Sequence, residues 1–167
     1  MSPEFKLYLI KEFERLKANE AYQYKLEWSA TRLLSKVNYV VHTDAIKEYI
    51  VPNLTESQKQ YVYSDEADIL NVALFGMTAK EWRDKNPELA KKGNIRDYTD
   101  LLHLVILNNL QNTSAELIED GLSQRERLIR LNESAKRQMK SLQNSKSMKD
   151  LELLQKQVKE ENKLITN

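Results

Sequence analysis

The sequence predicts an all-α fold: an irregular helical bundle with a long N-terminal helix and a C-terminal helical tail that is a candidate coiled coil. Two observations predict it. The 167 residues include only three glycines and three prolines, the residues least compatible with helix interiors. Apolar side chains also recur at steps of three and four residues, as they do on the buried face of an amphipathic helix.

The first predicted helix begins near the N-terminus and runs to about Tyr39, as one long helix or as two joined near Asn19. Ser2 can cap this helix, and Pro3 suits its first position. Its apolar face combines Phe5, Leu9, Phe13 and Leu16. The valines at positions 37, 40 and 41 also favour a strand, but they have no partner run of similar character, so we expect helix there as well.

Capping signals divide the middle of the chain into shorter helices. A short helix is expected over residues 44–50, before Pro52. Ser64 precedes another helix, which Gly76 closes. Capping boxes, in which a Ser or Thr and a Glu or Gln three residues later satisfy each other's backbone amides, predict three helix starts. These boxes are Thr55 with Gln58, Thr78 with Glu81, and Ser123 with Glu126.

The strongest apolar face predicts a central helix after a polar loop over residues 88–94. This face carries Tyr98, Leu101, Leu102, Val105, Ile106, Leu110 and Leu117. Gly121 ends the central helix, and the helix that follows completes a helical hairpin. We therefore divide the chain into a terminal helix over residues 1–20, a helical domain over 21–142, and a polar tail over 143–167. The apolar seam of the tail covers only about two heptads, fewer than the three to four that predict a coiled coil. We therefore interpret the tail as a weak oligomerisation helix or a frayed end.

Composition limits the classes of partner and compartment. The net charge is +1, so the chain has no overall field to attract nucleic acid or a membrane surface. The absence of cysteine excludes disulfides and thiolate metal sites and fits a reducing compartment. Neither a signal peptide nor an apolar run of about 20 residues is found. We expect a soluble, cytoplasmic protein that does not enter membranes.

No pattern in the sequence predicts catalysis, and we expect no catalytic residue, no cofactor and no metal. His42 and His103 are far apart and lack a second ligand at the spacing of a zinc site. We expect His42 to shape a helix junction and His103 to be a partly buried polar residue. The glycines are dispersed, which excludes a glycine-rich phosphate loop.

Two regions are candidate contact surfaces for a protein partner or a nucleic acid. In the first, Trp82 and Arg83 precede a basic loop that contains Lys92 and Arg96. The alternative is structural: Trp82 fills the core, Asn94 caps the next helix, and Arg96 or Asp97 holds the loop.

The second candidate surface is the helix over residues 123–142. Residues 122–167 hold 11 Lys or Arg and 6 Asp or Glu, a net charge of +5, whereas residues 1–121 carry −4. The candidate contacts on this helix are Arg125, Arg130 and Arg137, with Arg127, Lys136 and Lys140 beside them. Such a helix can follow a phosphate backbone, or its charges can simply be solvated.

Four stretches resemble one protein family. Residues 2–17 resemble the last helix of the KilA-N domain, a DNA-binding domain of phage, viral and mobile-element proteins. The other three resemble the helical region that follows this domain in bacterial members. They are residues 38–47, with His42-Thr43-Asp44-Ala45-Ile46-Lys47; residues 64–84, with Leu74-Phe75-Gly76-Met77-Thr78-Ala79-Lys80-Glu81-Trp82-Arg83; and residues 92–98, Lys-Gly-Asn-Ile-Arg-Asp-Tyr.

The resemblance, over roughly residues 2–142, implies a non-catalytic helical module beside a DNA-binding domain. It begins at that domain's last helix, so no DNA-contacting residue of the family is carried over. DNA is the implied partner of a full-length relative. For this chain we expect protein association, with Phe5, Leu9 and Phe13 as an apolar face that drives self-association. Independent nucleic-acid binding through the helix over residues 123–142 is the alternative.

Overall fold

The computed structural model describes residues 2–165, and the chain in this range is helical with no strand. The predicted all-α class is confirmed. Helix α1 (Pro3–Ala45) continues into a π-helical turn, η1 (Ile46–Ile50), and then into a 3₁₀ turn, η2 (Val51–Asn53). The prediction of a separate helix over residues 44–50 is therefore wrong, because the chain passes from α1 into η1 without a break.

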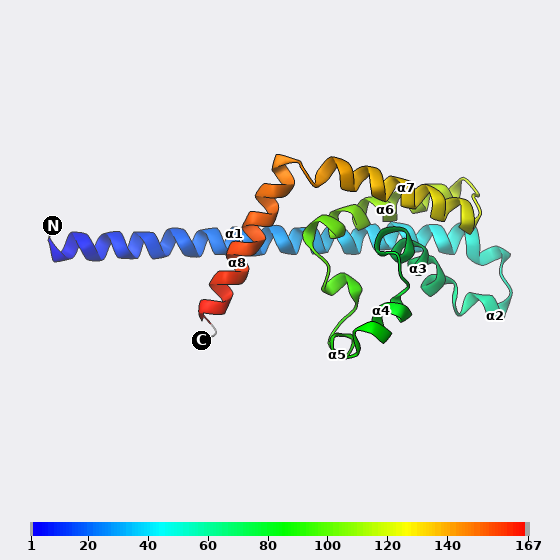
Figure 1. Cartoon of the computed structure of the whole chain (residues 1–167), viewed down its shortest axis with the longest axis horizontal. Helices are drawn as coiled ribbons and strands as arrows, with labels where there is room; N and C mark the ends of the chain where they lie inside the picture. The colour runs from blue at the N-terminus through cyan, green and yellow to red at the C-terminus, as the bar shows by residue number, and fades with distance from the viewer. Residues whose placement is uncertain (1, 166–167) are drawn as a thin grey trace.

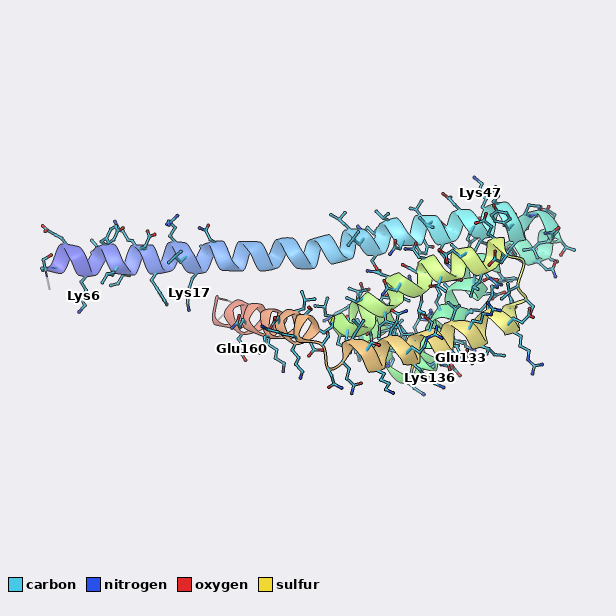
Figure 2. All side chains as sticks on the ribbon, turned by 90° about the horizontal axis from the view of Figure 1, so that it is seen from above. Lys6, Lys17, Lys47, Glu133, Lys136 and Glu160 are labelled. Carbon is cyan, nitrogen blue, oxygen red and sulfur yellow. The ribbon has the colours of Figure 1, made fainter. Side chains whose placement is uncertain are left out.

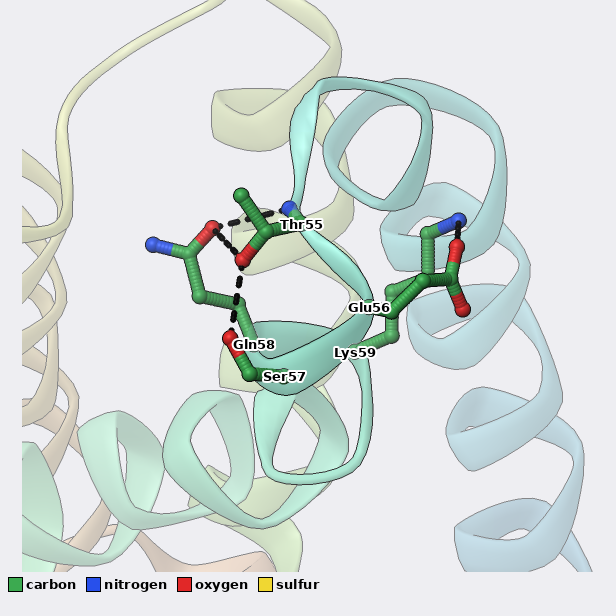
Figure 3. Close-up of polar contacts among 5 residues, drawn as sticks. All are labelled: Thr55, Glu56, Ser57, Gln58 and Lys59. Atoms are coloured by element: carbon green, nitrogen blue, oxygen red, sulfur yellow. Dashed lines mark hydrogen bonds and ion pairs between the residues drawn. The ribbon is translucent and has the colours of Figure 1, made fainter.

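Short helices follow, and the predicted capping boxes begin two of them. Thr55 and Gln58 form the box that opens α2, where the backbone amide of Thr55 donates to Oε1 of Gln58 at 2.9 Å (Figure 3). Thr78 and Glu81 form the box of α4. The elements of this region are α2 (Glu56–Lys59), α3 (Val62–Phe75), α4 (Ala79–Lys85), α5 (Pro87–Ala90) and η3 (Ile95–Asp97).

Two details of this region differ from expectation. Helix α3 begins at Val62, two residues before Ser64, whose hydroxyl instead donates to the carbonyl of Tyr61. The predicted loop over residues 88–94 contains the turn of helix α5, which Pro87 can begin because its missing N–H is not needed there. Gly76 closes α3 in the left-handed region at φ 70°, as predicted.

Three longer helices complete the chain: α6 (Leu101–Glu119), α7 (Gln124–Leu142) and α8 (Lys146–Ile165). The capping box of Ser123 and Glu126 begins α7 as predicted. The turn between α6 and α7 contains Gly121 at φ 76°. Helices α6 and α7 pack against each other and so form the predicted hairpin.

The core lies where α6 meets α1, α3 and α7. The larger apolar cluster contains Leu70, Ala73, Leu102, Ile106, Leu107, Leu110, Leu117, Leu131, Ala135 and Met148. A smaller cluster joins the end of α1 and the turn η1 to α3 and α6 through Ala45, Ile46, Val62, Ala115 and Ile118. Helix α6 contributes more buried residues than any other described helix and is the central helix of the bundle.

Only the C-terminal part of α1 belongs to this bundle. Both views show the N-terminal part of α1 extending far beyond the other helices (Figures 1 and 2). Helix α8 leaves the bundle at the end of α7 and passes close to the middle of α1. The chain is therefore a helical body from which one long helix projects, and we call residues 3–19 of α1 the arm.

Candidate functional site

A buried ion pair joins α3 to α7. The guanidinium of Arg127 donates from Nη1 to Oε2 of Glu66 at 2.7 Å and from Nη2 to Oε1 at 2.9 Å. Gln124 also donates from Nε2 to Oε1 of Glu66, at 3.1 Å. The side chains of Arg127 and Glu66 are 3% and 0% exposed. Burying two charges costs desolvation energy, which this two-pronged geometry offsets.

His42 and Ser114 form a second buried polar contact, between α1 and α6. Nε2 of His42 lies 3.1 Å from Oγ of Ser114. The pKa of His42 is lowered to about 4, chiefly by burial; Glu66 opposes this shift, and Arg96 and Arg127 contribute to it. His42 is therefore neutral near pH 7. It lies in the last turn of α1, before η1, and is buried within the bundle.

His42 and Ser114 resemble a base and a nucleophile, but a substrate has no access to them. Their exposed fractions are 2% and 1%. Nearby on α6, both amide atoms of Gln111 lack a hydrogen-bond partner within the described part of the chain, and Nε of Arg127 is unpaired as well. Buried polar atoms of this kind are typical positions for internal water molecules. The arrangement is thus a polar centre of the core, which we call the buried polar centre: His42, Glu66, Gln111, Ser114 and Arg127.

His103 is half-buried, as predicted, and it contacts the carboxylate of Asp100, a partner that the sequence did not indicate. Its Nδ1 lies 2.7 Å from Oδ1 of Asp100, and its ring stacks on Phe75 with centroids 5.8 Å apart. The same oxygen of Asp100 accepts the backbone amide of His103 and so caps α6. Within residues 2–165, no three His, Cys, Asp or Glu side chains are grouped so that they could hold a metal ion.

The predicted contact surface around Trp82 is only partly available. Trp82 is 8% exposed and stacks on Tyr98, with ring centroids 5.8 Å apart. The prediction that Trp82 contacts a partner is therefore wrong, because the indole is part of the core. Arg83 and Lys92 are exposed. Arg96 is half-buried, and burial lowers its pKa, an effect that nearby Tyr39, Asp68 and Asp97 oppose.

The loop that carries Arg96 is held by its own side chains, in line with the structural alternative. Asn94 caps η3 by accepting the backbone amide of Arg96 at 2.9 Å. Asp97 accepts the backbone amide of Asn94, also at 2.9 Å. Gly93 lies so close that an added Cβ would be 2.9 Å from Oδ2 of Asp97. A side chain at position 93 would therefore disturb this cap.

The basic helix α7 divides its arginines between the core and solvent. Arg125, Arg130 and Arg137 are exposed. Lys136 is exposed as well, and Figure 2 shows it on the outer side of α7. Arg127, grouped with them in sequence, is buried against Glu66 and cannot reach a phosphate. The exposed cationic surface of α7 therefore contains fewer arginines than the sequence of the helix indicates.

A groove of about 580 Å³ lies between the end of α3 and α7. Its lining consists of Val72, Ala73, Leu74, Phe75, Gly76, Asn132, Ala135, Lys136, Met139, Lys140, Gln143 and Asn144. This lining includes no histidine, acid or hydroxyl group. It therefore offers an apolar floor and two cations but no acid and base pair of the kind that general catalysis uses.

Exposed apolar side chains gather on α1. In the arm, Leu9, Phe13 and Leu16 are exposed, whereas the side chain of Phe5, which we predicted to share their face, lies outside the described residues. A second exposed group follows on the part of α1 that belongs to the body: Leu33, Leu34, Val37, Val40 and Val41. The exposed fractions of both groups lie between 44% and 61%. Monomeric soluble proteins rarely leave so large an apolar surface open, unless it binds a partner.

These features define a class of protein: an all-α body with a polar centre closed to solvent and a long helix with an open apolar face. No family model matches the sequence, and no curated protein or solved structure is significantly similar to it. Among the helices of residues 2–165, none has the length and apolar character that crossing a bilayer requires.

Proposed function

We propose that this chain is a non-catalytic helical module that associates with a second copy of itself through α1. The observation that carries this proposal is the exposed apolar surface of α1, which lies partly on an arm that the body does not cover. An isolated helix is marginally stable in water and gains most of its stability from burying an apolar face. Pairing would bury that face and stabilise the arm.

The resemblance of residues 38–47, 64–84 and 92–98 to KilA-N proteins supports a role for this module as one part of a larger DNA-binding protein. In such a protein it would stand beside a DNA-binding domain of phage or mobile-element type. Pairing of two chains would bring two such domains together. Two-fold pairing is the common arrangement for proteins that recognise duplex DNA with symmetric half-sites.

Substituting two leucines of the arm tests this proposal. We expect the sedimentation equilibrium mass of the wild-type chain to rise from monomer to dimer with concentration. A Leu9→Gln, Leu16→Gln variant should dissociate at least about 10,000-fold more readily or remain monomeric, because the dimer loses four buried leucines and each contributes roughly 1.5–3 kcal/mol. Leu7→Gln is the matched control, since Leu7 is equally exposed but lies on the other side of the arm. A monomeric wild-type chain at every concentration would contradict the proposal.

The exposed arginines of α7 favour a second candidate function, independent binding of nucleic acid. Arg125, Arg130 and Arg137 lie on the solvent side of one helix, where they can contact successive phosphates. We expect random duplex DNA to shift in a gel at low salt. The Arg125→Gln, Arg130→Gln, Arg137→Gln variant should reduce the slope of log affinity against log salt by roughly 3, about one for each lost contact. Absence of a shift at low salt removes this candidate.

A further inference from the structure

The two exposed apolar groups of α1 share one heptad frame. Leu9, Leu16 and Val37 are separated by multiples of seven residues, and so are Phe13, Leu34 and Val41. Between the two groups the frame passes through Asn19, Gln23, Leu26 and Ala30, so it is apolar at both ends and partly polar in its middle. A straight helix drifts by about 20° per heptad relative to such a frame, so two apolar groups that share it favour a left-handed supercoil with another helix. We call this row of positions the seam; it contains Leu9, Phe13, Leu16, Leu33, Leu34, Val37, Val40 and Val41.

The body leaves the seam open because it packs on another face of α1. Asn38 donates to the carbonyl of Asn108 at 3.1 Å, and His42 contacts Ser114. Ala45 and Ile46 are buried against α6. Asn38, His42, Ala45 and Ile46 follow one another at short helical steps and alternate with the seam residues along the chain. One face of α1 therefore packs against the body, and the face that carries the seam is exposed to solvent. The seam from Leu9 to Val41 spans about 48 Å at 1.5 Å per residue.

We propose that the seam pairs with the seam of a second copy as a parallel, in-register, two-stranded coiled coil. This inference rests on the proposed function and specifies its geometry. In the heptad frame Leu9, Leu16 and Val37 occupy a positions, and Leu33 and Val40 occupy d positions. A β-branched residue at a with leucine at d favours two parallel strands, as Val37 and Leu33 provide.

Asn19 specifies the direction of pairing. It is exposed and falls on a d position of the seam. In the parallel arrangement Asn19 faces Asn19 of the second copy, and the two amides can bond to each other. In the antiparallel arrangement that matches a with d positions, Asn19 faces position 30, an alanine that offers no side-chain partner. A single polar Asn pair in a core fixes register and favours the parallel dimer.

The flanking charges favour the same direction. Arg15 occupies a g position, and the sequence places a glutamate, Glu20, at the e position five residues later. Parallel helices bring g of one strand near the following e of the other, so these opposite charges are matched twice. The antiparallel alignment instead matches positions 20 and 27, both glutamates. Glu12 occupies a d position of the same frame, so the parallel arrangement places it opposite Glu12 of the second copy. The guanidinium of Arg15 binds its carboxylate at 2.6 Å and so offsets this repulsion.

Single cysteines test the direction directly, because the natural chain has none. We expect Leu9→Cys to form a disulfide-linked dimer in a glutathione buffer, and Val40→Cys to do the same. In each case the two identical positions face each other. Leu7→Cys, which lies away from the seam, should remain mostly unlinked. Circular dichroism should show that all three variants keep the helical content of the wild-type chain.

Mixing the two cysteine variants separates the possible outcomes. If Leu9→Cys and Val40→Cys each link only to the other, the strands run antiparallel; the inference is then overturned, but self-association stands. If the wild-type chain dimerises in sedimentation and neither variant links, the seam is not the interface and the inference is overturned. If the wild-type chain stays monomeric, the inference and the proposed function both fail.

Discussion

Replacing Arg127 with methionine is expected to lower the free energy of unfolding by about 3–5 kcal/mol. The substitution keeps the length of the side chain but leaves the carboxylate of Glu66, which is 0% exposed, with only the amide of Gln124 as a donor. A buried charge without its counter-ion is among the most destabilising defects in a folded protein, because neither water nor a cation replaces the lost partner. Urea denaturation measures the loss.

Two further variants separate the role of the ion pair from effects on helix propensity. Arg130→Met changes an exposed arginine of the same helix and should alter stability by no more than about 0.5 kcal/mol. Combining Glu66→Leu with Arg127→Met removes both charges and should recover most of the loss. If Arg127→Met alone costs less than about 1 kcal/mol, Glu66 is not a buried unpaired carboxylate in that variant, and the described ion pair is incorrect.

The boundaries that the sequence predicted well are those that local chemistry determines. The capping boxes at Thr55, Thr78 and Ser123 each satisfy backbone amides within three residues, so no distant part of the chain is needed to specify them. Gly76 likewise adopts a left-handed conformation that other residues avoid. The start of α3 was misplaced because Tyr61 and Val62 carry no such signal, and packing of Val62 determines the boundary.

The sequence could not show which residues meet in the buried polar centre, because its hydrogen-bonded pairs, Glu66 with Arg127 and His42 with Ser114, are 61 and 72 positions apart. A signal for its members did exist. Arg127 precedes Leu131 and Ala135 at steps of four, and Glu66 precedes Leu70 at the same step. A charged residue in phase with an apolar face is expected to be buried and therefore paired. Which residue pairs with it depends on how the helices pack.

The candidate contacts were predicted by residue type, and residue type does not determine exposure. Indole and guanidinium groups are common at interfaces, which makes Trp82 and Arg96 candidate contacts by residue type. The structure places Trp82 in the core and Arg96 at its edge, whereas Arg83 and Lys92 remain exposed. On the arm, in contrast, the apolar side chains of Leu9 and Phe13 are 45% and 61% exposed.

Acidification is expected to destabilise the protein through His42 in a defined pH window. The pKa of His42 is about 4 in the folded chain, against an ordinary value of 6.5. The unfolded chain therefore binds more protons than the folded chain between these two values, and stability falls as the pH is lowered from 6.5 to 4. A difference of about 2.5 pKa units corresponds to roughly 3 kcal/mol. Above pH 6.5 this contribution is fully present.

The cause of the shift is the position of the imidazole. Its ring lies between α1 and α6 at 2% exposure, where Ser114 is its one described hydrogen-bond partner. A proton on this ring would be a buried positive charge near Arg96 and Arg127, and Glu66, whose negative charge favours that proton, already binds Arg127. Protonation therefore favours the unfolded chain, in which water solvates the imidazolium.

Measuring the free energy of unfolding by urea titration between pH 7 and 4 tests this prediction, with His42→Gln as the control. Glutamine keeps a polar side chain at the contact with Ser114 but does not titrate, so its stability should stay nearly flat from pH 6.5 to about 4.5. Glu81 and Glu126, whose folded pKa values are lowered by hydrogen bonds at their helix caps, lose their contribution only as the pH falls below 4.5. Equal losses in both proteins between pH 6.5 and 4.5 would assign the acid sensitivity to other groups.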